Sequence, residues 1–270
     1  DKEGIRSNSI YSLLVDDRGA VWVGHFQAGL DYSLYQNGLF RTYAYPPQFN
    51  SANLSIRSFV NRGPEKVIGS RDGLFYINEA TGIVKSFVKP VLTSDLILTI
   101  CFYEGEYYIG TYGGGMMVLN PQTLSLKYFT QGDTELFQKG HIFCVKPDNR
   151  GNLWIGTSQG LFCYNGQTKQ IKNFTSTNSQ LPEGNVYEVS FDSTGKGWIA
   201  TETGMCIYDP ASQSLRSNVF PEGFVHKDKV RTIYEDAEHN LYFIREKGSL
   251  FTSTLTMDHF RNQSGLSTLP

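Results

Sequence analysis

The chain has 270 residues and a net charge of −2 at pH 7, so it lacks the basic footprint of a nucleic-acid-binding protein. Hydrophobic residues make up 40% of it, aromatic residues make up 14%, and it has 27 glycines, a balance that suits strands and tight turns. No run of about 18 or more apolar residues is present to cross a membrane, and no charged-then-apolar leader starts the chain, so we expect any signal peptide to have been removed.

The first predicted unit shows how the chain is built. An alternating strand, Ile10 to Val15, is followed by an acidic turn at residues 16–19, which is a hairpin signal. The segment Val21 to Tyr32, VWVGHFQAGLDY, then reads as two strands joined by a short polar turn. Later copies are NRGNLWIGTSQGLFCYN, from Asn149 to Asn165, and GWIATETGMCIY, from Gly197 to Tyr208. The same hairpin pattern therefore returns along the chain.

Six copies of this pattern recur at a nearly fixed interval. Its most prominent position is held by Trp22, Val67, Tyr108, Trp154, Trp198 and Tyr242. The steps between these positions are 45, 41, 46, 44 and 44 residues. A glycine opens the next strand in every copy, at Gly29, Gly73, Gly115, Gly160, Gly204 and Gly248. A period in the forties indicates propeller blades or paired-helix repeats, and the second is removed because no window of ten or more residues has a helical period.

Each unit holds four strand signals, named here a to d in chain order. Strands a are expected to begin at Ile10, Ile56, Ile97, Ile142, Val186 and Val230. Strand b carries the tryptophan position, and two residues later come Gly24, Gly69, Gly110, Gly156, Ala200 and Ile244. At the four glycines we expect neighbouring backbones to approach closely. Four short antiparallel strands per unit predict an all-β fold, a β-propeller of four-stranded antiparallel blades with six repeats visible.

The repeat also sets the expected organisation of the chain. We place the units near residues 9–50, 54–95, 97–138, 141–182, 185–226 and 229–264, and expect residues 1–270 to be a single β-propeller domain or a fragment of one. Six units can close on themselves or belong to a seven-bladed or larger array. In a propeller, strand a lines the central channel and strand d the rim. The b–c and d–a loops then share one face, and the a–b and c–d loops share the other.

The four cysteines, Cys101, Cys144, Cys163 and Cys206, fall within predicted strands at spacings that suit no zinc pattern. We expect four buried thiols, while disulfides stay open because an extracytoplasmic compartment would permit them. No metal site and no cofactor are predicted.

The run Gly151-Asn152-Leu153-Trp154-Ile155-Gly156-Thr157, followed by Gly160-Leu161, resembles the two-component regulator propeller repeat. The segment Ile10 to Asp17 resembles the opening strand of that repeat. The resemblance covers the whole chain, strongly in units one, four and five and weakly in the others. It implies the periplasmic sensor region of a bacterial hybrid two-component system, a region that often detects oligosaccharides. It also implies a homodimeric inner-membrane receptor whose membrane helix and histidine kinase are not visible here, and rings that usually have seven blades.

The b–c loops hold the most varied polar residues in otherwise regular units. On a propeller they ring one mouth of the channel, a usual place for a pocket with convergent polar groups. Aromatic rings there can stack on sugar faces while polar groups bond sugar hydroxyls; the alternative is that each residue is a solvated turn residue. The predicted ligand-binding residues are His25, Gln27, Arg71, Asp72, Tyr112, Gln159, Glu202 and Arg245.

Histidines raise the possibility of an enzyme. His25, His141 and His226 fall on or beside the b–c face, and propeller lyases use a histidine and a metal in that position. However, the chain has no HExxH, no Asp/Asn-rich calcium loop and no Gly-x-Ser-x-Gly. We therefore predict no catalytic residue in this region.

Paired acidic residues give a second route to an enzyme. Asp16 with Asp17, and Glu235 with Asp236, suggest the two carboxylates of a glycoside hydrolase. Their position just before the a–b turns instead indicates turn chemistry. The resemblance to the regulator propeller repeat, without any catalytic motif beside it, implies a non-catalytic extracytoplasmic ligand sensor, with a polysaccharide or antibiotic lyase and a protein-binding scaffold as the alternatives.

Overall fold

The computed structural model of the chain describes residues 4–16, 18–33, 40–43, 54–132, 134–217, 229–245, 250–254 and 261–262. Over these ranges the chain forms 24 strands in six four-stranded antiparallel sheets, and one short helix, α1 (Thr134–Lys139). Strands follow one another across each sheet in chain order, so every sheet is a meander. The sheets are the blades of a β-propeller, which confirms the fold class that the repeat predicted.

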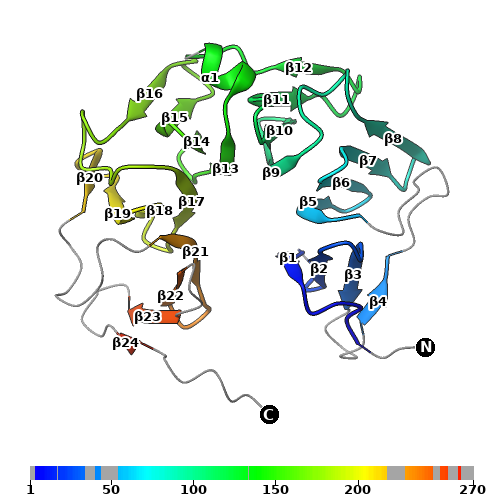
Figure 1. Ribbon diagram of the computed structural model, residues 1–270, viewed down its shortest axis with the longest axis horizontal. Coiled ribbons are helices and arrows are strands. Elements are labelled where there is room, and N and C mark those ends of the chain that lie inside the picture. Colours follow the sequence, from blue (N-terminus) through cyan, green and yellow to red (C-terminus); the bar gives the residue numbers. More distant parts are fainter. Residues whose placement is uncertain are drawn as a thin grey trace. The chain divides into compact units, whose positions relative to one another are not determined.

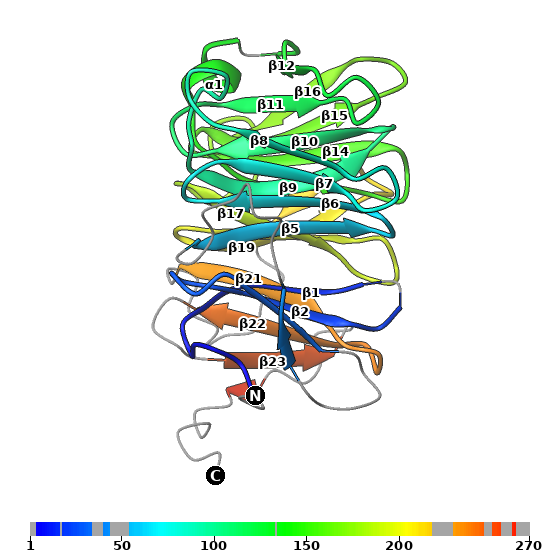
Figure 2. The same ribbon diagram turned by 90° about the vertical axis from the view of Figure 1, so that its right-hand side faces the viewer.

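The chain divides into two compact units, and the first, Asp1–Ile142, contains three sheets (Figure 1). Their strands are β1 (Ile10–Val15), β2 (Val21–His25), β3 (Leu30–Ser33) and β4 (Phe40–Thr42); β5 (Ile56–Arg62), β6 (Glu65–Ser70), β7 (Leu74–Asn78) and β8 (Ile83–Phe87); and β9 (Ile97–Tyr103), β10 (Glu106–Thr111), β11 (Met116–Leu119) and β12 (Leu126–Tyr128). Strands β1, β5 and β9, the three strands a, are neighbours. Figure 2 shows β5, β6 and β7 running side by side, so the loops of this sheet gather at the two opposite ends of its strands.

The second unit, Phe143–Pro270, holds the other three sheets. Their strands are β13 (Ile142–Pro147), β14 (Asn152–Thr157), β15 (Gly160–Asn165) and β16 (Ile171–Phe174); β17 (Val186–Phe191), β18 (Gly197–Thr201), β19 (Gly204–Asp209) and β20 (Ser214–Arg216); and β21 (Val230–Glu235), β22 (Asn240–Arg245), β23 (Leu250–Thr254) and β24 (Arg261–Asn262). Strand β17 borders β21, so strands a are again neighbours.

An aspartate six residues before the tryptophan position closes the a–b turn in four sheets, at Asp16, Asp148, Asp192 and Asp236. In the fourth sheet, Asp148 Oδ1 accepts the backbone N–H groups of Arg150 and Asn152, each at 2.8 Å. The other oxygen, Oδ2, accepts the ring N–H of Trp154 at 2.9 Å. One carboxylate therefore fixes both the turn and the buried ring, and the acidic turn residues have the structural role predicted for them.

The glycine of strand b lies where the next sheet comes closest. A Cβ atom on Gly69 would lie 2.6 Å from Cγ2 of Ile97, the first residue of the neighbouring strand a. On Gly156 it would lie 2.8 Å from the backbone oxygen of Val186. Real Cβ atoms essentially never approach other atoms this closely, so a larger side chain would force neighbouring sheets apart.

The fourth residue of strand a is a core residue in five sheets but not in the first. Phe59, Ile100, Val145, Val189 and Ile233 hold this place in the second to sixth sheets, and each is at most 8% exposed. In the first unit, Phe59 packs on Trp22 of the preceding sheet, with ring centroids 5.0 Å apart. Leu13, the fourth residue of β1, is 67% exposed. The first sheet thus presents an apolar surface that its counterparts bury.

None of the four cysteines forms a disulfide, and all four lie within the described residues; Cys101, Cys144 and Cys206 are buried and Cys163 is half-buried. Burial raises the pKa of the Cys144 and Cys206 thiols well above their usual range, and that of Cys163 to about 12. Because the thiolate is the reactive form, we expect almost no reaction of the native protein with an aromatic disulfide reagent at pH 8. All four thiols should react once denaturant unfolds the chain. Rapid labelling of Cys163 in the native protein would contradict this burial.

Candidate functional site

The b–c loop and the segment that leads into strand a lie at the same end of the strands in a sheet. The first b–c loop residue donates its backbone N–H to the residue just before strand a: Phe26 to Ser9 at 2.8 Å, Arg71 to Ser55 at 3.1 Å, Tyr112 to Leu96 at 3.0 Å and Glu202 to Asn185 at 2.9 Å. In these four sheets, the loops that the sequence assigned to one face are therefore joined by a backbone hydrogen bond. This hydrogen bond fixes the backbone of the loop, and the loop side chains project from that end of the strands.

A β-bulge follows directly. The a–b register shifts between the first and third residues of strand a in the first, second, third, fifth and sixth sheets. The residues at the bulge are Tyr11, Arg57, Leu98, Tyr187 and Arg231. A bulge re-aims a side chain out of the regular alternation of a strand. Five sheets thus place a bulged second residue next to their b–c loop.

Three positions per sheet define what we call the b–c band: the residue before strand a, the second residue of strand a, and the first residue of the b–c loop. In the first unit the band comprises Ser9, Tyr11, Phe26, Ser55, Arg57, Arg71, Leu96, Leu98, Tyr112 and His141. In the second unit the described members are Phe143, Ser158, Asn185, Tyr187, Glu202, Lys229 and Arg231.

The band of the first unit contains two aromatic contacts. Tyr11 lies against Phe26 with ring centroids 5.3 Å apart, and the Arg57 guanidinium lies 4.7 Å from the centre of the Tyr11 ring. The Nε–H of Arg57 is buried and has no hydrogen-bond partner among the described residues. Further along, the rings of Tyr112 and His141 are 4.0 Å apart. Tyr112 is half exposed, so this aromatic pair is open to a ligand.

The band of the second unit is centred on Tyr187. Its ring has the Arg231 guanidinium at 4.7 Å and the Lys229 ammonium at 4.8 Å, and its centroid lies 5.1 Å from that of Phe143. The Tyr187 hydroxyl donates to Glu202 Oε2 at 3.1 Å, and Asn185 Nδ2 donates to the same oxygen at 2.6 Å. Side chains from three successive sheets therefore meet at one tyrosine.

The structure places most of the predicted ligand-binding residues on b–c loops. Gln27, Arg71, Asp72, Tyr112 and Gln159 are exposed, and Glu202 is half-buried. Arg245 ends β22, and its side chain lies outside the described residues. His226 also lies outside them. The prediction that all these residues ring one mouth stays a prediction, because each unit is described by itself.

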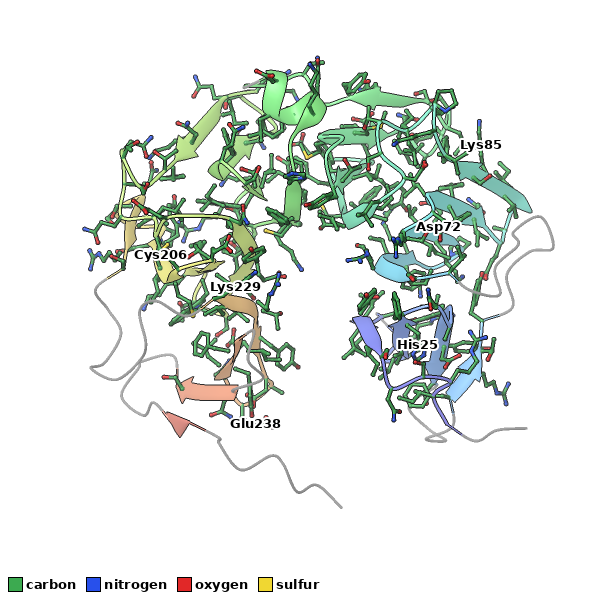
Figure 3. The ribbon with its side chains drawn as sticks, in the orientation of Figure 1. His25, Asp72, Lys85, Cys206, Lys229 and Glu238 are labelled. Atoms are coloured by element: carbon green, nitrogen blue, oxygen red, sulfur yellow. The ribbon has the colours of Figure 1, made fainter. Side chains whose placement is uncertain are left out.

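His25 differs from the prediction. It is fully buried at the end of β2, where Figure 3 shows it within the first sheet. Its Nε2 lies 2.9 Å from Oδ2 of the buried Asp31, whose Oδ1 accepts from Arg6 Nε at 3.0 Å and from Thr42 Oγ1 at 3.3 Å. A buried carboxylate needs such partners. His25 therefore belongs to the interior of the sheet and is not a surface ligand contact.

Sequence reasoning missed Tyr11, Arg57, Tyr187, Lys229 and Arg231, because it searched the b–c loops and not the starts of strands a. A signal was present. The second residue of strand a is aromatic or arginine in five of the six units, directly after an isoleucine or valine. In a strand with one wet face this position would otherwise suit a small polar residue.

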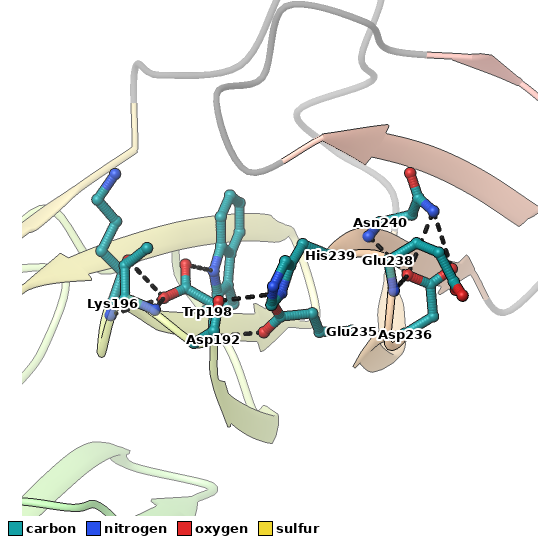
Figure 4. A network of polar contacts seen from close by, with 10 residues as sticks. Asp192, Lys196, Trp198, Glu235, Asp236, Glu238, His239 and Asn240 are labelled. Carbon is teal, nitrogen blue, oxygen red and sulfur yellow. Dashed lines mark hydrogen bonds and ion pairs between the residues drawn. The ribbon is translucent and has the colours of Figure 1, made fainter.

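The a–b loops show a different chemistry. In the second unit, Glu235 accepts from the backbone N–H of Ser193 at 2.8 Å and pairs with His239 Nδ1 at 2.7 Å (Figure 4). Asp192 and Asp236 beside them close their turns. Each of these three carboxylates accepts hydrogen bonds from turn or loop residues. The a–b loops therefore hold these neighbouring sheets together.

No cluster of three or more His, Cys, Asp or Glu side chains suited to a metal ion occurs among the described residues. A search of the same residues for a helix long and apolar enough to cross a membrane finds none.

The architecture is shared with known β-propellers. A β-propeller domain of Cps50 (Swd1) from Myceliophteria thermophila superposes with a TM-score of 0.68 at 9% identity, covering 98% of this chain and 90% of that chain. At this identity the likeness shows the fold alone. The class of the protein is thus a β-propeller.

The repeat itself is identified by a family model. The model described as two component regulator propeller matches residues 4–27 and 137–159, which include β1 and β2 of the first sheet and β13 and β14 of the fourth. The resemblance seen in the sequence is therefore confirmed. No curated protein sequence matches this chain.

Two structures of extracellular domains from B. thetaiotaomicron are also similar. The extracellular domain of the hybrid two-component system BT3049 from B. thetaiotaomicron has a TM-score of 0.76 and 22% identity, with 93% of this chain and 34% of that chain covered. That of BT4673 from the same organism has a TM-score of 0.63 and 18% identity, with 92% and 38% covered. The present chain thus spans about a third of the length of these domains.

Proposed function

We propose that this chain is an extracytoplasmic ligand-sensing region of a two-component signalling protein, and that its b–c bands bind an oligosaccharide. The family-model match and the two receptor domains of similar structure support the sensor class. The observation that carries the ligand assignment is the composition of the bands. Tyr11, Arg57, Tyr187 and Arg231 stand at bulged positions, and Ile56, Val186 and Val230, the first residues of their strands in three of these four sheets, are buried scaffold.

The chemistry of the bands suits sugars. A pyranose ring offers apolar C–H faces and a rim of hydroxyl groups. The exposed Tyr112 ring, packed against the His141 ring, provides a platform for such a face. Arg71, whose backbone N–H donates to Ser55, provides side-chain donors for hydroxyl or acidic groups. In such folds the sheets usually form a rigid scaffold, and the loops and strand ends carry the residues that recognise the ligand.

The proposal includes binding without catalysis. Of the histidines considered for a lyase, His25 is buried against Asp31, and His141 is stacked on Tyr112. In these positions His25 stabilises the interior of the sheet, and His141 forms part of the aromatic platform. A lyase on the same band is the outcome that product analysis would detect.

The test is calorimetric titration of the chain with a panel of oligosaccharides, with analysis of the same mixtures for cleavage products. Tyr112→Ala and Arg71→Ala should each weaken binding by about 1–3 kcal/mol, because a ligand group in contact loses its partner. Arg150→Ala, which removes an exposed side chain from an a–b turn, is the matched control. If only the control weakens binding, the ligand uses the opposite edge; if new reducing ends appear, the region is an enzyme.

A further inference from the structure

We infer that Arg57 is the centre of a subsite for an acidic group of the ligand, a carboxylate or a sulfate, in the band of the first unit. This inference rests on the proposed function, because it assigns the ligand of that band to the acidic sugars. Its basis is a half-buried guanidinium that lies on an aromatic ring and has no carboxylate beside it.

Arg57 has no counter-ion within the described part of the chain. Its Nε–H is buried without a hydrogen-bond acceptor, and its two Nη atoms, which solvent reaches, form no hydrogen bond or ion pair with a described residue. The guanidinium lies 4.7 Å from the centre of the Tyr11 ring. The face of that ring attracts the cation but does not accept the hydrogen bonds that the guanidinium donates in its own plane. An anion that accepts them would stabilise the half-buried charge.

A second arginine of the same strand shows what a complete pairing looks like. Arg62, the last residue of β5, also lies on a ring, with its guanidinium 3.3 Å from the centre of the Phe102 ring. Unlike Arg57, it has a carboxylate, since its Nη1 donates to Glu65 Oε2 at 3.3 Å. The fold therefore neutralises the arginine at the a–b end of β5, whereas the arginine at the b–c end has no such partner.

A second cation leaves the same end of this sheet. The backbone N–H of Arg71 donates to the carbonyl oxygen of Ser55, two residues before Arg57. The side chain of Arg71 is exposed and forms no ion pair with any residue that the structure describes. Two arginines thus start from neighbouring backbone positions, and an anion at Arg57 is close to the charge of both.

The carboxylates at this end of the second sheet leave Arg57 unpaired. Asp72 is exposed on the b–c loop, and Asp95 precedes β9, where its Oδ1 accepts the backbone N–H of Lys89 at 2.7 Å. Within the described ranges, neither carboxylate forms an ion pair with Arg57. Residues 44–53 contain no acidic residue. The partner that Arg57 lacks is therefore best supplied by a ligand.

The backbone presents the guanidinium beside an apolar surface. Arg57 stands at the β-bulge where the register shifts between Ile56 and Ser58. The Tyr11 ring under it is 45% exposed, and its centroid lies 5.3 Å from that of Phe26. The planar fork of an arginine matches the two oxygens of a carboxylate or sulfate. An acidic sugar can thus place its anionic group on Arg57 and an apolar C–H face beside these two rings.

The first unit supplies a matched control. Arg41, in the outer strand β4, is exposed and carries the same charge, but it is not part of the band. If the removal of an arginine acts only through the net charge of the chain, Arg57→Gln and Arg41→Gln should have the same effect.

The experiment titrates the whole chain with three probes of equal length: an oligogalacturonate, a sulfated chondroitin oligosaccharide and a neutral cello-oligosaccharide. At least one acidic probe should bind more tightly than the neutral one, and its affinity should fall as salt is raised. Arg57→Gln should weaken that binding about tenfold, as expected for loss of a charged hydrogen bond. Arg57→Lys, which keeps the charge but loses the planar fork, should weaken it less, and Arg41→Gln should leave it unchanged.

A probe without any sugar separates this inference from the proposed function. Sodium sulfate, compared with sodium chloride at the same ionic strength, should raise the unfolding temperature of the wild type and Arg41→Gln more than that of Arg57→Gln. The general effect of sulfate on protein stability acts on all three proteins alike.

Two results would overturn the anionic subsite: equal sulfate shifts in all three proteins, or an acidic probe that binds Arg57→Gln as tightly as the wild type. Binding of the neutral probe would then leave oligosaccharide sensing intact. Binding of none of the three oligosaccharides would overturn the proposed function, and the sulfate comparison would still show whether Arg57 binds an anion.

Discussion

Replacing Trp154 by alanine is expected to destabilise the protein by about 3–5 kcal/mol, the usual cost of removing a buried aromatic ring. Trp154 is 1% exposed. Its ring stacks on Phe174 at 5.8 Å and meets the edge of Tyr208 at 4.5 Å, so three strands lose contacts together. Denaturant unfolding followed by tyrosine fluorescence and circular dichroism measures the loss. Tyr128→Ala, at a ring that is 43% exposed, is the control and should change stability by no more than about 0.5 kcal/mol.

A second substitution at the same place separates packing from hydrogen bonding. Trp154→Phe keeps much of the ring but removes the N–H that Asp148 accepts at 2.9 Å. The same oxygen of Asp148 still accepts from Asn152 Nδ2 at 2.8 Å, so the carboxylate is not left unpaired. We expect the smaller cost to be on the order of 1–3 kcal/mol. An equal cost for both substitutions would mean that the turn, and not the packing, dominates at this position.

The strand pattern was predictable from sequence because the repeat reports it six times. A buried tryptophan with an aspartate six residues earlier, as in Trp154 and Asp148 or Trp198 and Asp192, fixes both the phase of strand b and the end of strand a. The glycine two residues later marks the side on which the next sheet approaches. The tryptophan, the aspartate and the glycine each have one dominant physical cause, and all three give the same position for strand b.

The candidate site was predicted only in part, for two physical reasons. The prediction was confined to the b–c loops, because the alternation of a strand does not reveal in advance that a bulge shifts its register by one residue. Tyr187 and Arg231 were missed for this reason, although their residue types were a signal. The misplacement of His25 has another cause. Asp31 follows it by six residues on the adjoining strand β3, but Arg6, which pairs with the same carboxylate, precedes the first strand, and the sequence pattern does not show that these groups meet inside the sheet.

Ile100→Ala is expected to cost about 2–5 kcal/mol, whereas Leu13→Ala should cost no more than about 0.5 kcal/mol. The two residues hold the same place in their sheets, the fourth residue of strand a, and remove side chains of equal volume. Ile100 is 7% exposed, and Leu13 is 67% exposed. The two substitutions are matched in side-chain volume, in position along strand a and in lying within the first unit. The difference between their losses in free energy of unfolding therefore measures whether the outer surface of β1 is buried.

The same pair of variants also tests whether that surface stays uncovered in solution. Ile97 and Ile100, at the matching positions of the third sheet, are buried against Gly69, on strand b of the preceding sheet. A covering sheet would bury Leu13 in the same way, and the cost of Leu13→Ala would then approach that of Ile100→Ala. A cost that also rises with protein concentration would identify a second copy as the cover, because association stabilises only the bound form. A small cost at every concentration would show that β1 contributes no core from its outer surface, as the exposure of Leu13 predicts.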